Sequence, residues 1–211
     1  MPATTIEQPQ QKYVFGPSSD DEEAWKEARR HVLSATQLAD IASGSDASFR
    51  ALYRKRRGHD DFLGNRYTLH GNERELFIAG YALGKYGLIH NRDLMISTVW
   101  PWLAATPDLI SPDGDWVVDA KTKHSKAGRL VKPPRRYADQ VIVQGLVTGA
   151  RKLGLLAEHW SGEDGEPAVI EDDEPVLMGI DWDQERAEHL LAVGERYIEF
   201  EDEEDIINSY Q

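Results

Sequence analysis

Residues 106–121 read TPDLISPDGDWVVDAK, and this stretch decides the fold that the sequence predicts. The Pro-Asp-Gly at 112–114 favours a turn, and the apolar residues on either side of it favour the two strands of a hairpin. Asp108 then ends one strand and Asp119 ends its partner. Because side chains alternate along a strand, Asp119 and Lys121 lie on the same face. The hairpin is therefore expected to bring two carboxylates together beside one ammonium group.

Such a cluster suits the hydrolysis of a phosphodiester. Carboxylate oxygens and a main-chain carbonyl, here that of Ala120, are the hard ligands that Mg²⁺ prefers, and the metal acidifies a water molecule and neutralises charge on the phosphate. Lys121 can orient that water or stabilise the transition state. On spacing alone, a surface ion pair between Asp119 and Lys121 with Asp108 as a turn residue explains the pattern equally well. We assign Asp113 to the turn.

Composition narrows the protein class. The chain has 211 residues, which is enough for one domain, and no Cys, which excludes disulfides, thiol catalysis and Cys-ligated zinc. The net charge of −13 comes from acids concentrated beyond residue 157. Basic stretches at 50–66 and 121–136 are either solvated surface or tracks that bind phosphate. The sequence contains neither a membrane-spanning run nor a signal segment, so we expect a soluble intracellular protein without a membrane partner.

Periodicity and capping residues, among them a capping box formed by Ser34 and Gln37, predict an α/β fold with a central mixed β-sheet flanked by helices. We expect a single domain over 21–203, a flexible N-terminal tail over 1–20 and an acidic C-terminal tail over 204–211. In the long helix over 72–86, we expect Leu76, Ala79, Tyr81, Leu83 and Tyr86 to be buried. The other helices are expected at 22–31, 34–42, 46–57, 135–149 and 184–201, and the strands at 94–99, 102–106, 116–121, 152–160 and 176–181.

Four blocks of sequence resemble a known family. The hairpin resembles the PD-(D/E)xK nuclease motif, and the segments around it are similar to the phage lambda exonuclease or YqaJ family of viral recombination exonucleases. AWKEARRHVLSAT at 24–36 is similar to the opening segment of that family. GNERE at 71–75 resembles its Gly-x-x-x-Glu helix start, and YADQVIVQ at 137–144 resembles its Tyr-x-x-Gln-Val helix. The blocks occur in the family's order, and the resemblance implies a restriction-endonuclease-like core.

The resemblance also implies roles for individual residues. Asp108, Asp119 and the carbonyl of Ala120 would bind the metal, Lys121 would be the catalytic lysine, and Glu75 would be an additional acid at the metal site. A pocket for the 5′-phosphate of DNA would be formed by Arg29, Ser34, Thr36, Thr106 and Gln140, and an Arg with hydroxyl and amide donors is what phosphate binding requires. A further phosphate-binding Arg of the family has no match in register, and Lys126 and Arg129 are its substitutes. Two departures from the family are Leu109 in place of Gly and Asp119 in place of the commoner Glu.

In function, the resemblance implies a magnesium-dependent exonuclease, with Mn²⁺ as a substitute metal. It would degrade one strand of linear double-stranded DNA from 5′ to 3′, releasing mononucleotides and leaving a 3′ single strand for recombination. The resemblance further implies a homotrimeric ring, a single-strand annealing protein as partner, and a phage protein acting in the cytoplasm of the bacterial host. Two alternatives stay open: an endonuclease on the same core, and a non-catalytic DNA-binding or recombination accessory protein.

Overall fold

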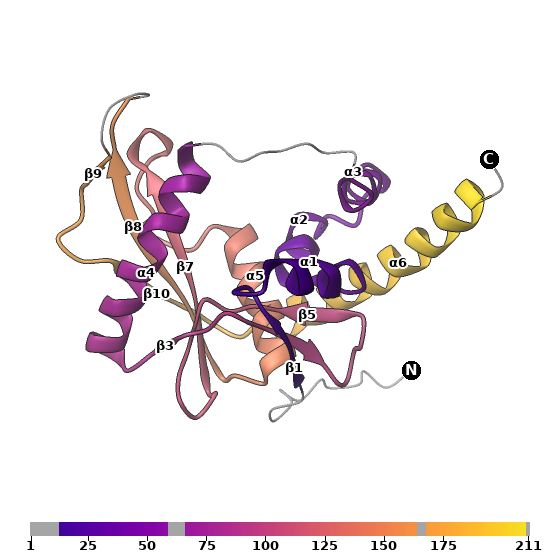
Figure 1. Cartoon of the computed structure of the whole chain (residues 1–211), viewed down its shortest axis with the longest axis horizontal. Coiled ribbons are helices and arrows are strands. Elements are labelled where there is room, and N and C mark those ends of the chain that lie inside the picture. The colour runs from indigo at the N-terminus through magenta and orange to yellow at the C-terminus, as the bar shows by residue number, and fades with distance from the viewer. Residues whose placement is uncertain (1–12, 59–65, 164–167, 210–211) are drawn as a thin grey trace.

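The computed structural model describes residues 13–58, 66–163 and 168–209. Two mixed β-sheets and the helices packed on them form the molecule, which confirms the expected α/β class (Figure 1). The sequence predicted one central sheet, whereas the strands divide between two. In chain order the elements are β1 (Tyr13–Ser18), α1 (Glu22–Arg30), β2 (Leu33–Ser34), α2 (Ala35–Asp40), α3 (Asp46–Arg56), α4 (Arg66–Tyr86), β3 (Ile89–His90), β4 (Asp93–Ser97), β5 (Leu103–Ala105), β6 (Leu109–Ile110), β7 (Trp116–His124), a 3₁₀ turn (Ser125–Ala127), α5 (Arg135–Thr148), β8 (Lys152–Ser161), β9 (Val169–Ile170), β10 (Val176–Ile180) and α6 (Gln184–Ser209).

The larger sheet contains a hairpin at the expected turn, but the expectation that Asp108 ends its first strand is wrong, because that strand is β6, which begins after Asp108, and β5 belongs to the other sheet. The strand order of the larger sheet is β10-β8-β7-β6-β3, with β9 paired to β8. Strands β6 and β7 pair antiparallel with Leu109 opposite Val118, so that Asp108 and Asp119 are next in register. Strand β7 does not end near Lys121 as expected but continues to His124, because β8 pairs with it in parallel along its whole length. The connection from β7 to β8 runs through α5, as a parallel pair requires.

The smaller sheet has the order β1-β4-β5-β2. Its edge strand β1 lies within the expected N-terminal tail, so the prediction of a flexible segment over 1–20 is wrong for residues 13–18. The aromatic and β-branched residues at 13–15 favour an extended chain, and β4 offers an edge with which β1 pairs antiparallel, with Tyr13 opposite Ser97. Residues 1–12 of the expected tail lie outside the described residues.

Helix α5 joins the two sheets through the core. Val141, Val143 and Leu146 are fully buried in the main apolar cluster, together with residues from both sheets and from α2 and α6. The helix approaches β8 closely at Gly145, where a Cβ atom would lie 2.9 Å from Cδ2 of Leu153. Side chains on α5 are therefore positioned by the most enclosed part of the molecule.

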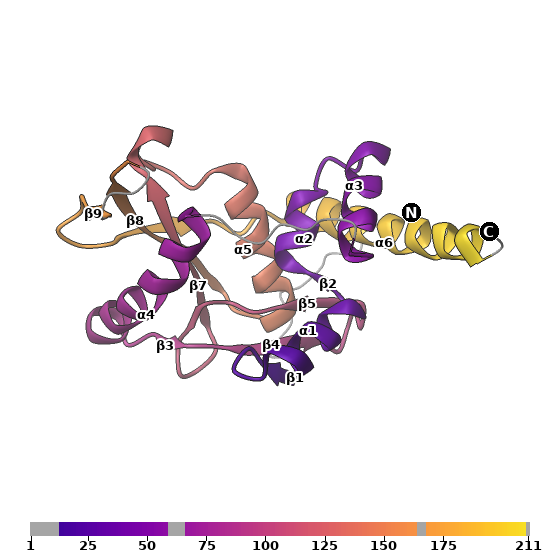
Figure 2. The same cartoon turned by 45° about the horizontal axis from the view of Figure 1, so that its top comes forward.

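Helix α4 begins at Arg66, before the expected start at residue 72, and covers the larger sheet over β7 (Figure 2). The buried apolar residues in its described part are Ile78, Ala79 and Ala82. The expectation that Leu76 and Leu83 are buried is wrong, because their exposed fractions are 60% and 57%. The helix carries apolar residues around more than half of its circumference, so periodicity did not identify the side that meets the sheet.

Helix α6 continues to Ser209, so residues 204–209 are helical and not a separate acidic tail. Two basic residues at the end of α3 pair with acids of α6: Arg56 donates to Glu201 at 2.8 Å, and Arg57, which caps α3, forms an ion pair with Asp205. The end of α6 extends beyond the rest of the molecule in both views (Figures 1 and 2). No helix in the described ranges is both long and apolar enough to cross a membrane.

Candidate active site

The turn between α1 and α2 positions an arginine. Ser34 accepts a hydrogen bond from the Gln37 N–H at 3.3 Å, and the Gln37 side chain accepts from the Ser34 N–H at 2.9 Å, which confirms the expected capping box. Arg29, in the last turn of α1, donates to Oγ of Ser34 at 3.3 Å and lies 4.2 Å over the ring of Trp25. The cap and the ring together hold the guanidinium in one orientation.

Arg29 is a cation without an acidic partner among the described residues. Burial and then the nearby charge of Arg56 lower the pKa of Arg29 below its ordinary value. The indole Nε1 of Trp25 beside it is buried and has no hydrogen-bond acceptor in the described part of the chain. A cation without an acidic partner beside an N–H without an acceptor, both within the described residues, favours an anionic ligand.

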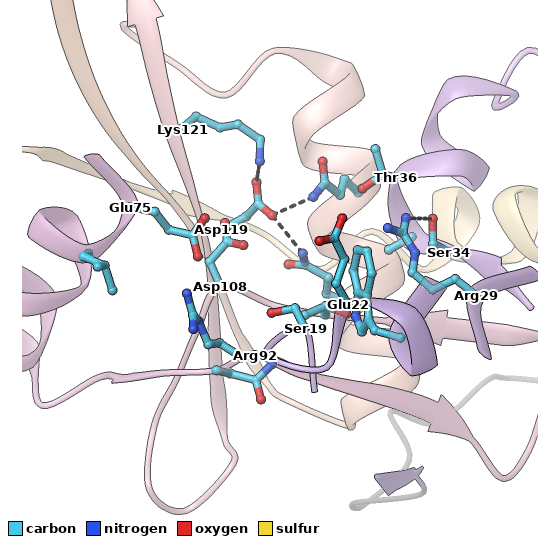
Figure 3. Close-up of a pocket in the computed structure, with 17 residues that line it drawn as sticks. Ser19, Glu22, Arg29, Ser34, Thr36, Glu75, Arg92, Asp108, Asp119 and Lys121 are labelled. Carbon is cyan, nitrogen blue, oxygen red and sulfur yellow. Dashed lines mark hydrogen bonds and ion pairs between the residues drawn. The ribbon is translucent and has the colours of Figure 1, made fainter. Parts of the chain in front are cut away.

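Asp119 is the most enclosed acid of the expected cluster, with 1% of its surface exposed. Its Oδ1 accepts hydrogen bonds from Gln140 at 2.6 Å and from Gln144 at 2.9 Å, both on α5. Its Oδ2 forms an ion pair with the ammonium of Lys121 but accepts no well-directed hydrogen bond (Figure 3). One oxygen of Asp119 is therefore fixed by α5, while the other has the ion pair with Lys121 but no hydrogen-bond donor directed at it.

Asp108 precedes β6 and faces the same cluster. Its Oδ2 accepts a hydrogen bond from the Ala120 N–H at 2.7 Å. Burial and then the charge of Asp119 raise the pKa of Asp108 to about 8. Burial alone would lower the pKa of Lys121, but the charges of Asp119 and Asp108 outweigh it and raise that pKa above its ordinary value. The cluster thus contains one permanent cation and two carboxyl groups that repel each other when both are ionised.

Glu75 reaches this cluster from the middle of α4. Its Oε1 lies 2.8 Å from Nε2 of His90 on β3. Asn91, the next residue, donates through Nδ2 to the carbonyl of Pro107 at 2.9 Å, and its N–H donates to the carbonyl of Asp108 at the same distance. Sequence reasoning missed both His90 and Asn91, because nothing in the spacing of the chain links β3 to the hairpin.

One cavity of about 520 Å³ collects these groups (Figure 3). Figure 3 shows Glu75, Asp108 and Asp119 on one side of it and Arg29 and Ser34 on the other. The cavity brings together nine of the predicted site residues, namely Arg29, Ser34, Thr36, Glu75, Thr106, Asp108, Asp119, Lys121 and Gln140. Trp25, Glu22, Asn91, Arg92 and Gln144 also line it, and none of them was assigned to the site from the sequence.

Two residues that were predicted to bind phosphate, Lys126 and Arg129, lie away from this cavity. Nζ of Lys126 pairs with Glu163 at 2.7 Å, and Arg129 pairs with Asp172 and, at 3.7 Å, with Glu171. Neither lines the cavity. Because β7 continues beyond Lys121, the chain leaves the site before it reaches these residues.

The donor set fits a magnesium ion. In the part of the chain that the structure describes, no three acidic or His side chains form a ready-made metal cluster. Mg²⁺ nevertheless needs only one or two carboxylates, with water filling its other positions. Oδ2 of Asp119, at which no hydrogen bond is directed, and the raised pKa of Asp108 are features that a bound cation would satisfy. The carbonyl of Ala120, which accepts from Nζ of Lys121 at 3.2 Å, belongs to the same group of oxygens.

No model of a known protein family and no curated protein sequence matches the chain. Solved structures do. The alkaline exonuclease of Laribacter hongkongensis is similar with a TM-score of 0.66 at 18% identity, over 89% of this chain and 96% of that one. The structure of that enzyme in complex with dAMP is similar with a TM-score of 0.63 at 18% identity, over 87% of this chain and 93% of that one. A phage-related exonuclease from Haemophilus somnus 129PT is similar with a TM-score of 0.60 at 13% identity, over 85% of this chain and 96% of that one. The chain therefore has the fold of these exonucleases, as the resemblance implied.

Proposed function

We propose that this protein is a magnesium-dependent exonuclease that degrades one strand of linear double-stranded DNA from its 5′ end. The observation that carries the proposal is that one cavity holds both Arg29, a cation that pairs with no acid among the described residues, and the cluster of Asp108, Asp119 and Lys121. The first group suits a terminal phosphate and the second suits hydrolysis of the next phosphodiester.

In this mechanism, Arg29 and Ser34 bind the 5′-phosphate and thereby position the first phosphodiester at the carboxylates. A water oxygen forms a bond to phosphorus, the bond from phosphorus to the 3′ oxygen breaks, and that oxygen leaves with a proton as a 3′ hydroxyl. Lys121 stabilises the charge that develops on the phosphate. Gln140 and Gln144 keep Asp119 in place. Mg²⁺ held by Asp108, Asp119 and the Ala120 carbonyl, with Glu75 nearby, would acidify the water and neutralise charge.

The neighbouring structures support a nucleotide product. The Laribacter enzyme has been solved with dAMP, a deoxynucleoside monophosphate, and its fold covers most of this chain. Release of mononucleotides and a remaining 3′ single strand follow from the proposed reaction. We further propose that the protein assembles as a homotrimeric ring and works with a single-strand annealing protein in the host cytoplasm. Light scattering of the purified protein tests the assembly.

Digestion of defined DNA tests the proposed activity. With Mg²⁺ or Mn²⁺, a linear duplex carrying a 5′-phosphate should be consumed to mononucleotides, whereas a closed circle of the same sequence should survive. Chelation of the metal should stop the reaction. Cutting of the circle would favour the endonuclease alternative, and binding of DNA without any cutting would favour the accessory protein.

A further inference from the structure

A second cavity, of about 490 Å³, adjoins the candidate active site. It lies between α4 and β7, and the two cavities share Thr36, Glu75, Asp108 and Lys121. Strand alternation explains the arrangement: Asp119 lines the first cavity, whereas Ala120 and Thr122 line the second. The catalytic cluster therefore stands at the junction of two spaces.

The two cavities differ in chemistry. The first contains Arg29, which suits a phosphate. Apart from the shared charged residues Glu75, Asp108 and Lys121, the described residues that line the second cavity are uncharged. They supply an aromatic ring, hydroxyl groups and an apolar surface at Ile78, and they are Thr36, Tyr67, Thr68, Gly71, Ile78, Ala120 and Thr122. Such a lining suits a base and a sugar better than a phosphate. The volume lies within the range of about 300–1,000 Å³ that is typical of small-ligand sites.

Tyr67 is the aromatic group of the second cavity. Its ring packs against His124 at 5.7 Å and against Trp160 at 5.6 Å between centroids. His124 is itself fixed, since Nε2 lies 3.0 Å from the carbonyl of Gly162. These contacts hold the ring from one side, while 52% of the residue stays exposed. A large aromatic side chain that is supported and yet open suits the stacking of a base.

We propose that the second cavity binds the nucleotide on the 3′ side of the bond that is cut, with its base stacked on Tyr67. This inference rests on the proposed exonuclease function. The terminal nucleotide occupies the first cavity, the scissile phosphate lies at Asp108 and Lys121, and the second nucleotide occupies the space under α4. After each cut, the new 5′-phosphate moves from this junction to Arg29.

Abasic substitution locates the second nucleotide. Duplexes with a labelled 5′-phosphate receive one abasic residue at the second or third position, and release of the first nucleotide is measured in a single turnover. For the wild type, an abasic second position should slow release by about 5- to 150-fold relative to an abasic third position, which is the size of one base-aromatic stack. Tyr67→Ala should slow cutting of intact DNA by a similar factor and remove the difference between positions, whereas Tyr67→Phe should keep it.

Two further variants make the result decisive. Tyr67→Leu keeps a large apolar side chain but removes the aromatic face, so it should slow cutting and remove the difference between positions as Tyr67→Ala does. It provides the test if the alanine variant folds poorly. Leu69→Ala removes another exposed apolar residue of α4 that does not line the cavity, and it should behave as the wild type. Equal rates for the two abasic positions in an active wild type would overturn this inference and leave the proposed function standing. A wild type that cuts no end at all would overturn both.

Discussion

The main-chain N–H of Ala120 donates a 2.7 Å hydrogen bond to Oδ2 of Asp108. This bond connects the strand that carries Asp119 and Lys121 to the residue that faces them across the hairpin. It leaves the other oxygen of Asp108 and the carbonyl of Ala120 on the cluster, which is how a short β-hairpin presents several oxygen ligands at once.

Removing the charge of Asp119 should abolish cleavage without unfolding the protein. In Asp119→Asn, the side-chain oxygen can still accept from Gln140 and Gln144, so the core bonds persist while the charged metal ligand is lost. Loss of one carboxylate ligand should cost several kcal/mol, or at least about a thousandfold in turnover. Digestion of linear duplex measures the loss, and circular dichroism checks the fold. Asp113→Asn, in the exposed turn, is the matched control and should cut normally. A near-normal rate for folded Asp119→Asn would sink the metal-site assignment.

Lys121→Ala should separate turnover from binding. Turnover should fall by about a hundredfold or more, because the ammonium stabilises charge that develops only in the transition state. DNA affinity should change little, since one phosphate contact is a small part of the total. Single-turnover rates and fluorescence anisotropy give the two quantities. Lys85→Ala, at the far end of α4, is the control. Equal losses in both quantities would instead make Lys121 a general DNA anchor.

Arg29→Ala should erase the preference for a 5′-phosphate over a 5′-hydroxyl. A charge-assisted hydrogen bond contributes about 1.5–3 kcal/mol, so the wild type should prefer the phosphorylated end by about 10- to 150-fold. Initial rates on duplexes that differ only at the 5′ terminus measure this preference. Arg30→Ala is a close control, because Arg30 is exposed and already paired with Glu27 at 2.7 Å. Equal wild-type rates on both ends would remove the phosphate pocket.

The raised pKa of Asp108 predicts an unusual dependence of stability on pH in the metal-free protein. With a folded pKa of about 8 and an ordinary value of 3.8, the folded state binds more protons than the unfolded state between these values. The free energy of unfolding should therefore fall as pH rises from about 4 to about 8, by at most about 1.4 kcal/mol per pH unit from this group. Urea unfolding in a chelator at pH 5 and pH 8 measures it. Asp108→Asn should lose most of the difference, and a variant with the same slope as the wild type would contradict the assignment.

Gly145→Ala should destabilise the fold, because its Cβ would lie 2.9 Å from Leu153 in the core. Overpacking of this kind costs about 1–3 kcal/mol. Gly80→Ala on α4 is the matched control, since a Cβ there meets no atom within 4 Å. It should stabilise the protein by up to about 1 kcal/mol through helix propensity. Thermal unfolding of both variants compares the two effects.

The parts of the fold that local chemistry determines were predictable. The turn at 112–114 and the capping box at Ser34 depend on residues that are neighbours in sequence, and both were confirmed. The side of α4 that packs against the larger sheet could not be predicted, because the exposed residues Leu76 and Leu83 are as hydrophobic as the buried Ile78. The pairing of Glu75 with His90 depends on where β3 lies beside α4, which only tertiary packing determines.

The two halves of the candidate active site are held by helices that are buried to very different extents. Asp119 is fixed by glutamines on α5, which is buried between both sheets, whereas Arg29 lies on α1, every residue of which keeps part of its surface exposed. Local opening requires less free energy at the surface than in the core. On gentle heating, the protein should therefore lose its ability to recognise a phosphorylated end before it loses its ability to cut, and it would pass through a temperature range in which it is still a nuclease but a less discriminating one.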